Sequence, residues 1–229
     1  MYDLNNAGEQ TVIGDLIPDG TFARVRLTIK PGGAGIQGSA PMDVGLFTSS
    51  QSSVAIMLST EMTVIAGPFA KRKLWQMFTI AGGKLDDKGA SKGWNISKAT
   101  FRAMIDSRLG LKQSDMSPDA QAKRRLNGLK ELDGIEFAAK IIVEPAANPQ
   151  YRDSNRIERV LVPGDAQYEA VMNGQAVPAE PSNRKPKPAT AGAAPAAQAS
   201  APAWATAAAP AAAAAAAAKP AAGPAWLNG

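Results

Sequence analysis

The chain has 229 residues and a formal net charge of +5, and it contains no cysteine and no histidine. Without cysteine no disulfide or thiolate metal site can form, and without histidine the commonest general base and metal ligand is missing. We therefore expect neither an enzyme nor a bound cofactor. No uncharged apolar run approaches the ~18 residues that a membrane helix needs, and the N-terminus lacks the charged and apolar regions of a signal peptide. The composition indicates a soluble intracellular protein with no membrane partner.

Alternating apolar and polar residues predict three strands in the first third of the chain. The first covers residues 21–30 and follows a Pro-Asp-Gly turn at residues 18–20. A second strand is expected over residues 54–65, after a long loop rich in Gly and Ser, and Gly67-Pro68 ends it. The third strand follows almost at once, over residues 71–80.

Two helices are expected after these strands. Either Asn95 or Ser97 can cap a helix that runs to Leu109, and Gly110 is a suitable stop because glycine readily adopts the left-handed conformation of a helix end. A shorter helix is expected to begin at Ser117, because the following proline is favoured at the first helical position.

Strand character returns over residues 131–143 and again over residues 157–162. Three strands, a helix and two more strands is the order of the OB-fold. This is a five-stranded Greek-key barrel whose second and third strands commonly carry oligonucleotides. We therefore expect residues 1–177 to form a mainly β, OB-fold-like domain with a helix inserted between the third and fourth strands.

Positive charge is concentrated in one part of the sequence. Residues 71–130 contain 14 Lys and Arg against 5 Asp and Glu, whereas the segments on either side are acidic. This asymmetry favours contact with a polyanion. The alternative is a solvated face whose charges pair with the acidic flanks once the chain is folded.

Trp75 is the central residue of the functional interpretation. It has the same strand parity as Lys71 and Lys73, and Phe78, on the opposite parity, is expected to offer a second flat face on which bases can stack. Cations that contact phosphates, together with aromatic faces that stack on bases, hold single strands without sequence readout. The alternative is that Trp75 is a core aromatic and the lysines merely extend past it into solvent.

Residues 178–229 differ in composition from the rest of the chain. They are rich in Ala and Pro, begin with a basic linker, and have no carboxylate side chain after Glu180. Such a segment buries too little apolar area to order itself, so we expect a disordered tail. Pro-Ala-Trp occurs in it twice, ending at Trp204 and Trp226. These residues are candidates for docking a replication or recombination protein, although compositional drift would also account for them.

Several stretches of the chain together resemble a phage and prophage family that was long labelled as of unknown function and is often described as single-stranded-DNA-binding. The stretches are residues 67–69, 73–75, 78–80, 96–102 and 132–137, and the resemblance covers roughly residues 22–162. The layout of a barrel, a Pro-rich tether and a short terminal motif is also similar to bacterial single-stranded-DNA-binding proteins. In those proteins the terminal peptide is acidic and recruits partners, whereas this tail is not acidic.

The expected function is sequence-tolerant binding of single-stranded DNA in phage or prophage DNA replication or recombination, in the cytoplasm of a bacterial host cell. Stacking and backbone charge do not distinguish RNA from DNA without a contact to the 2′-OH. Because residues 1–180 are nearly neutral, we expect modest affinity that falls with salt, unless a homo-oligomer brings several basic faces together. The candidate nucleic-acid-binding residues are Arg24, Arg26, Lys71, Arg72, Lys73, Trp75, Trp94, Lys98, Arg102, Arg108, Lys123, Arg124 and Arg125.

The second hypothesis is a structural or adaptor protein, such as an inhibitor of a host protein, that acts through protein–protein contacts of the tail. In that case the lysines of residues 71–73 are an ordinary solvated strand edge, since charged residues often protect exposed strands. The third hypothesis is an enzyme. Asp86 and Asp87 lie in a Gly-rich loop where carboxylates can bind a hard cation, but two carboxylates alone are a weak signal.

Overall fold

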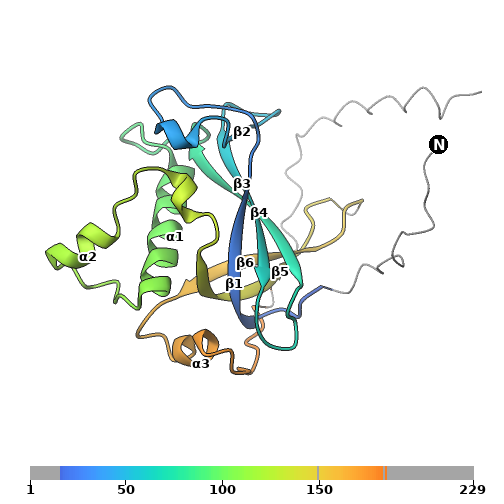
Figure 1. The fold of residues 1–229 in the computed structure, drawn as a ribbon. Helices are drawn as coiled ribbons and strands as arrows, with labels where there is room; N and C mark the ends of the chain where they lie inside the picture. Colours follow the sequence, from blue (N-terminus) through green and yellow to red (C-terminus); the bar gives the residue numbers. More distant parts are fainter. Residues whose placement is uncertain (1–15, 149, 183, 185–229) are drawn as a thin grey trace, which may run out of the picture. The chain divides into compact units, whose positions relative to one another are not determined.

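The computed structural model describes residues 16–148, 150–182 and 184, and Figure 1 shows how its elements are arranged. The strands are β1 (Thr21–Lys30), β2 (Thr48–Ser49), β3 (Ile56–Val64), β4 (Lys73–Ala81), β5 (Glu136–Glu144) and β6 (Ser154–Leu161). The helices are α1 (Lys92–Leu109), α2 (Pro118–Lys123) and α3 (Tyr168–Met172), with the 3-10 helices η1 (Pro41–Asp43) and η2 (Leu129–Leu132). The described part of the chain is therefore mainly β.

The six described strands form one antiparallel sheet in the order β4-β3-β1-β5-β6, with the short β2 paired to the start of β3. β4 and β6 contact each other, and the backbone N–H of Ile157 donates to the Gln76 side-chain oxygen over 3.0 Å. Within the described residues, however, no backbone ladder joins these two strands. The five-stranded barrel expected from the sequence is therefore not confirmed, because a sixth strand is present and the sheet is not closed.

The main core lies between one face of this sheet and α1. Leu27, Leu58 and Phe137 of the three central strands are fully buried on this face. Phe101 of α1 packs edge-to-face against Phe78 of β4, with ring centroids 5.1 Å apart. These alternating positions of β1 and β3 are the ones that the period-two pattern predicts to be buried, and the core follows directly from that pattern.

Part of the opposite face, which we call the outer face, is covered by α3. The residues of this second, smaller core are Phe22, Ala138, Leu161, Tyr168 and Val171. The Tyr168 hydroxyl donates to the carbonyl of Ser107 at the end of α1 over 2.6 Å. Because its neighbours bury this hydroxyl, the pKa of Tyr168 is raised above its usual value. α3 was missed by the sequence analysis because five residues give too little periodicity.

The helix boundaries correct part of the sequence prediction. α1 begins one turn earlier than expected, because the Ser91 side chain caps it by accepting a backbone N–H of the first turn over 3.2 Å. Asn95 and Ser97 therefore lie inside the helix. Gly110 ends α1 with a φ of 67°, as predicted, and Ser117 caps α2 with proline in the first turn, also as predicted.

The strand boundaries of β1, β3 and β4 agree with the prediction to within two residues at each end. β5 starts later than the predicted residue 131, because the turn of η2 takes the residues before it. The register of β5 with β6 shifts between Lys140 and Ile141, where Glu158 of β6 is the extra residue. Ile141 and Ile142 are both buried, although consecutive residues of a strand point to opposite faces.

The chain after α3 returns to the start of β1. The backbone N–H of Glu180 donates to the Gly20 carbonyl over 3.0 Å, and the N–H of Ser182 donates to the Asp19 carboxylate over 2.7 Å. The described chain thus stays attached to the sheet as far as residue 182. Among the described residues, no helix has the length and apolar character that crossing a membrane would require.

Candidate nucleic-acid interface

β4 places two large apolar side chains in solvent on the outer face of the sheet. Trp75 is 63% exposed and Met77 is 53% exposed, whereas Leu74 and Phe78 of the same strand are buried in the main core. Trp75 is therefore exposed, and the alternative of a core aromatic is wrong. Phe78 is buried and cannot supply the second stacking face expected from the sequence. Met77 widens the apolar surface beside the indole ring, because residues two apart on a strand lie on the same face.

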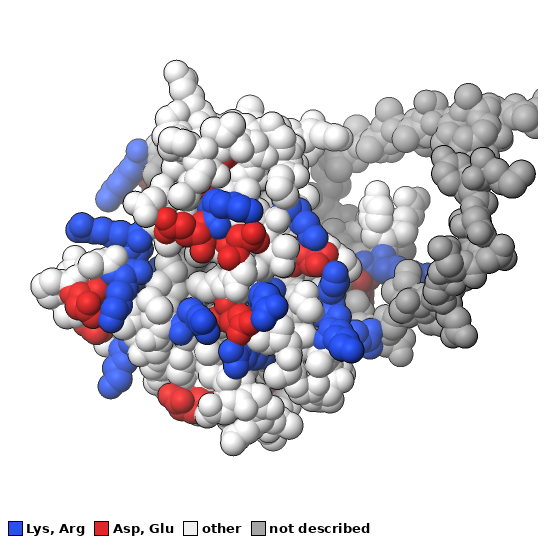
Figure 2. Space-filling model, in the orientation of Figure 1, with Lys and Arg blue, Asp and Glu red and all other residues white. Residues whose placement is uncertain are grey.

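Pairing of β4 with β3, and of β3 with β1, places charged side chains around Trp75. Trp75 lies directly opposite Glu61 of β3, and Glu61 lies opposite Thr28 of β1. Lys73 and Lys30 share this face, one on each side of Glu61. Figure 2 shows basic and acidic side chains interleaved over this face of the molecule. The aromatic side chain therefore stands in a mixed, net basic surface.

Glu61 lies between two lysines. Its Oε1 is 2.9 Å from Lys73 Nζ and its Oε2 is 3.3 Å from Lys30 Nζ, so that each carboxylate oxygen has one cation. The hydrogen bond from Lys73, assisted by Lys30 and opposed by burial, lowers the pKa of Glu61 below its usual value. Glu61 is therefore ionised at neutral pH.

Glu136 of β5 repeats this arrangement with two arginines. Arg26 donates to Oε1 through both Nε, over 3.0 Å, and Nη2, over 2.5 Å, while Arg24 Nη2 is 2.5 Å from Oε2. The hydrogen bonds from Arg26, with a smaller effect of Arg24, lower the pKa of Glu136 against the opposing effect of burial. Arg24 also donates to the Met172 carbonyl of α3 over 3.1 Å. Arg24 is therefore the more strongly held of the two arginines.

Cations without an ion-pair partner lie at both ends of β4. Lys71 and Arg72 are in the β3–β4 hairpin, where Lys71 has a φ of 70°. At the other end, the loop to α1 and the first turn of α1 carry Lys84, Lys88 and Lys92. None of these five side chains forms an ion pair with any other described residue. The strand between them has nine residues, which is about 30 Å at ~3.3 Å per residue.

Trp94 and its neighbours on α1 are less available than Trp75. The Trp94 ring is half-buried and packs edge-to-face on Phe101 at 6.3 Å between centroids. Lys98 Nζ lies 5.6 Å from the centroid of the Trp94 ring. Arg102 is exposed but donates to the Gln113 carbonyl over 2.7 Å. These side chains mainly hold the first turns of α1 and the loop after it in place.

Arg124 has a structural role. Its side chain is 9% exposed, and its Nε is 2.6 Å from the fully buried Asp106 carboxylate. Its two other nitrogens donate to the carbonyls of Asp115 and Lys112. A guanidinium with these partners is not available to phosphate, so we leave Arg124 out of the interface. Arg108 and Arg125 are exposed, and Lys123 pairs with Asp119 at 2.7 Å, all in the α1–α2 region and not on the outer face.

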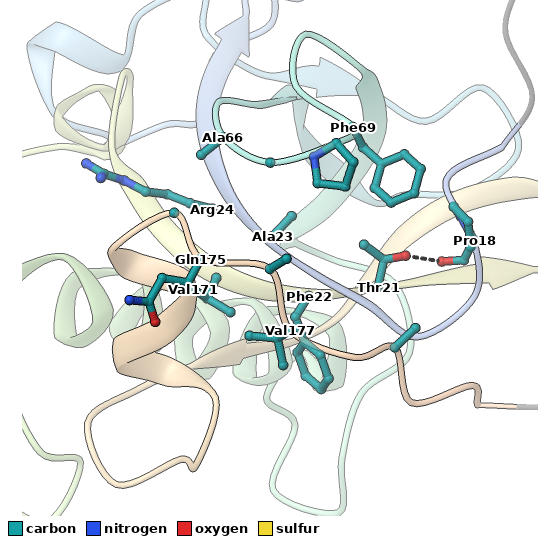
Figure 3. Close-up of a pocket in the computed structure, with 15 residues that line it drawn as sticks. Pro18, Thr21, Phe22, Ala23, Arg24, Ala66, Phe69, Val171, Gln175 and Val177 are labelled. Atoms are coloured by element: carbon teal, nitrogen blue, oxygen red, sulfur yellow. Dashed lines mark hydrogen bonds between the residues drawn. The ribbon is translucent and has the colours of Figure 1, made fainter.

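A separate cavity of about 220 Å³ lies between the hairpin of residues 65–70, the start of β1 and the segment after α3. Figure 3 shows Phe69 on one side of it and Phe22, Val171 and Val177 on the other. Arg24 is the one charged residue among those that line it. Thr21 and Gln175 also line it and the other lining residues are apolar or glycine, so the cavity suits a small hydrophobic group, and its lining offers no acid–base pair for catalysis.

Comparison of the chain with protein-family models, with curated proteins and with solved structures gave no match. The candidate docking residues Trp204 and Trp226 lie outside the described residues.

Of the residues predicted to bind nucleic acid, the structure brings together Arg24, Arg26, Lys73 and Trp75 on the outer face. It places Lys71 and Arg72 at the end of this face and sets the α1–α2 cations apart from it.

Sequence reasoning missed several residues of this face. Lys30 and Met77 lie on strands whose alternation was recognised, so their parity alone would have identified them. Glu61 and Glu136 could not be placed, because their partners are joined to them by strand pairing between distant parts of the chain. The sequence identified the lysines after β4 only as part of a loop rich in Gly, Lys and Asp.

Proposed function

We propose that this protein binds single-stranded nucleic acid along β4, without strong sequence preference. The observation that carries this proposal is the exposure of Trp75, a 63% exposed aromatic on β4. Beyond both ends of this strand lie cations that have no ion-pair partner in the described part of the chain. Base stacking on an aromatic side chain combined with backbone contacts to cations is the usual basis of sequence-tolerant single-strand binding. The track would begin at the β3–β4 hairpin and end at the lysines before α1.

The strand order supports an OB-like barrel that is partly open. When the two-residue β2 is set aside, β3 and β4 are the second and third strands and α1 is inserted between the third and the fourth. The Gln76 side chain bridges to β6 where backbone pairing would close a barrel. In OB-folds the second and third strands commonly carry the oligonucleotide, and these are the strands that hold Trp75 and Glu61.

We propose single-stranded DNA as the ligand, in phage or prophage replication or recombination. A double-stranded ligand is disfavoured because the outer face is a shallow strand surface that offers no helix to a major groove. Few cations of this face lack an ion-pair partner among the described residues, so binding should be modest, and its salt dependence should be that of a small number of phosphate contacts.

The function is tested by fluorescence anisotropy of labelled oligo-dT, oligo-rU and a DNA duplex of the same length, titrated with the full chain at low and high salt. The expected result is saturable binding of oligo-dT at low salt, weaker binding of the duplex, and a loss of affinity as salt rises. Equal binding of oligo-rU would extend the ligand class to RNA. Absence of binding to all three at low salt would overturn the proposal.

The adaptor hypothesis depends on Trp204 and Trp226 and stays a separate proposal. Removing residues 185–229 leaves the described ion pairs of Arg184 with Glu144 and Glu158 in place. Loss of biological activity with unchanged oligonucleotide binding would favour an adaptor role for the tail. Unchanged activity would exclude that role.

A further inference from the structure

Four cations and two carboxylates of the outer face form two similar units. In each unit one carboxylate has a separate basic side chain on each of its oxygens: Lys73 and Lys30 on Glu61, and Arg26 and Arg24 on Glu136. We call these four cations and two carboxylates the charge ladder. Its net charge is positive, but each of its cations has an intramolecular anion within 3.3 Å.

The carboxylates lie deeper than the cations. The side chains of Glu61 and Glu136 are 12% and 15% exposed, whereas those of Lys30, Lys73 and Arg26 are about half exposed. A phosphate that approaches from solvent therefore meets the cations first. It reaches them on the side opposite the carboxylate that already neutralises them.

We infer that Glu61 and Glu136 compete with the phosphates of a bound strand for the cations of the charge ladder, and so keep binding weak and readily reversible. This inference rests on the proposed function and concerns the same site. It makes the two glutamates positioning residues that act through the lysines and arginines, and they set the affinity without contacting a base.

Distance makes the competition unavoidable at Glu61. A phosphate that contacts Lys73 Nζ lies within one Debye length of the Glu61 carboxylate, about 8 Å at physiological ionic strength, so the repulsion is only partly screened. Trp75 and Glu61 are directly opposed residues of the β3–β4 ladder, which places their Cβ atoms about 5 Å apart. A base stacked on Trp75 therefore brings its own phosphates close to this carboxylate.

The competing explanation is that the charge ladder only joins the strands. Opposite charges on neighbouring strands do stabilise a sheet, and a carboxylate also restrains the lysines on either side of it. If that were its whole role, removing the carboxylate charge would leave oligonucleotide affinity unchanged or would lower it. Competition therefore predicts that removing the carboxylate charge raises oligonucleotide affinity, whereas a purely structural role predicts no change or a decrease. One substitution separates the two explanations.

The test is Glu61→Gln in the full chain, with oligo-dT anisotropy as the readout and a thermal melt to establish that the variant is folded. We expect affinity to rise at least about threefold, the effect of losing a repulsion of the size of one exposed ion pair. The dependence on salt should also become steeper, by about 0.7 in the slope of log K against log salt for each phosphate newly contacted. A purely structural carboxylate would not move that slope.

Two further variants keep the result specific. Glu169→Gln removes the same charge from an exposed position of α3 that has no ion-pair partner among the described residues, and it measures the general effect of net charge. In a Lys73→Gln background, the gain from Glu61→Gln should shrink, because part of the competition runs through Lys73. If Glu61→Gln does not fold, Glu136→Gln makes the same test with Arg26.

The outcomes distinguish this inference from the function on which it rests. Oligo-dT binding by the wild type, with no gain from folded Glu61→Gln or Glu136→Gln beyond that of Glu169→Gln, would overturn the inference and leave the function standing. No binding by the wild type or by either variant would overturn both.

Discussion

The two halves of the outer face differ in whether a helix covers them, and β1 runs through both halves. At its start, Phe22 lies under α3 and is 7% exposed, together with Ala138 and Tyr168. Four residues later, Arg26 reaches solvent, and beyond it Trp75 and Met77 of β4 remain uncovered. The same face therefore has one apolar half that is closed by a helix and one half whose apolar residues are left open.

This fold does use a helix to cover an aromatic side chain on the outer face. The exposure of Trp75 is therefore a specific feature of the half of the face that contains β4. The chain places a helix over its other outer-face aromatic, and it fills the space around Trp75 with charged groups instead. Large exposed apolar surfaces with a polar surround are typical of interaction sites. The predictions below separate the two halves by asking which substitutions change stability and which change binding.

The largest expected effect is on the covered half. Tyr168→Ala should lower the free energy of unfolding by about 3–5 kcal/mol, because it empties a buried aromatic site. Oligo-dT affinity, measured where the variant is still folded, should not change. Tyr168→Phe, which removes only the hydrogen bond to Ser107, should cost about 1 kcal/mol in a urea titration. A Tyr168→Ala loss below that of Tyr168→Phe would contradict the packing described for α3.

Trp75→Ala should have the opposite profile. Because the ring is mostly in solvent, we expect the urea midpoint to move little, while oligo-dT affinity falls by about 1–3 kcal/mol, the value of one stacked base. Met116→Ala is the matched control, since Met116 is 58% exposed but lies in the loop between α1 and α2. Equal affinity of Trp75→Ala and wild type would remove Trp75 from the binding site.

The hairpin cations should affect the salt dependence more than stability. In the double variant Lys71→Ala, Arg72→Ala, the slope of log K against log salt should become shallower by about 1.4, since each phosphate contact to a single strand contributes about 0.7. Lys112→Ala, an exposed lysine of the α1–α2 loop, serves as the control. If neither the slope nor the affinity changed, the bound strand would not extend beyond Lys73 into the β3–β4 hairpin.

The smallest expected effect is a dependence of stability on pH. The pKa values of Glu61 and Glu136 in the folded protein lie below the usual 4.5. Their ion pairs are therefore fully stabilising above that value, and this stabilisation is lost as the pH falls through the lower, folded-state pKa. Glu61→Gln should reduce the loss of unfolding free energy between pH 5 and pH 3, as measured by urea titration at each pH, and Glu169→Gln should reduce it less.

The parts of this structure that follow from local periodicity were predictable from the sequence. The alternation along β4 placed Lys73 and Trp75 on one face, and the same rule placed Val25 and Leu27 in the core. The direction of Trp75 remained open at that stage, because a tryptophan between lysines fits either a core or a surface position. The burial of its neighbours Leu74 and Phe78 decides it.

The parts that depend on distant pairing were not predictable in this way. The sequence shows Arg124 only as one of three consecutive basic residues, and its burial depends on the fold of the α1–α2 loop over Asp106. The pairing of Arg26 with Glu136 joins residues 110 positions apart. Charge patterning along the chain therefore identified a basic region correctly, but it could not separate cations used by the fold from cations left in solvent.

The most direct test of the central claim uses Trp75 as its own probe. In a full-length variant with Trp94→Phe, Trp204→Phe and Trp226→Phe, the remaining fluorescence comes from Trp75 alone. Titration with poly-dT should quench this emission at low salt, and the quenching should weaken as salt rises. If anisotropy shows that oligo-dT binds this variant while the Trp75 emission stays constant, the strand does not lie along β4, and the interface proposed here is wrong.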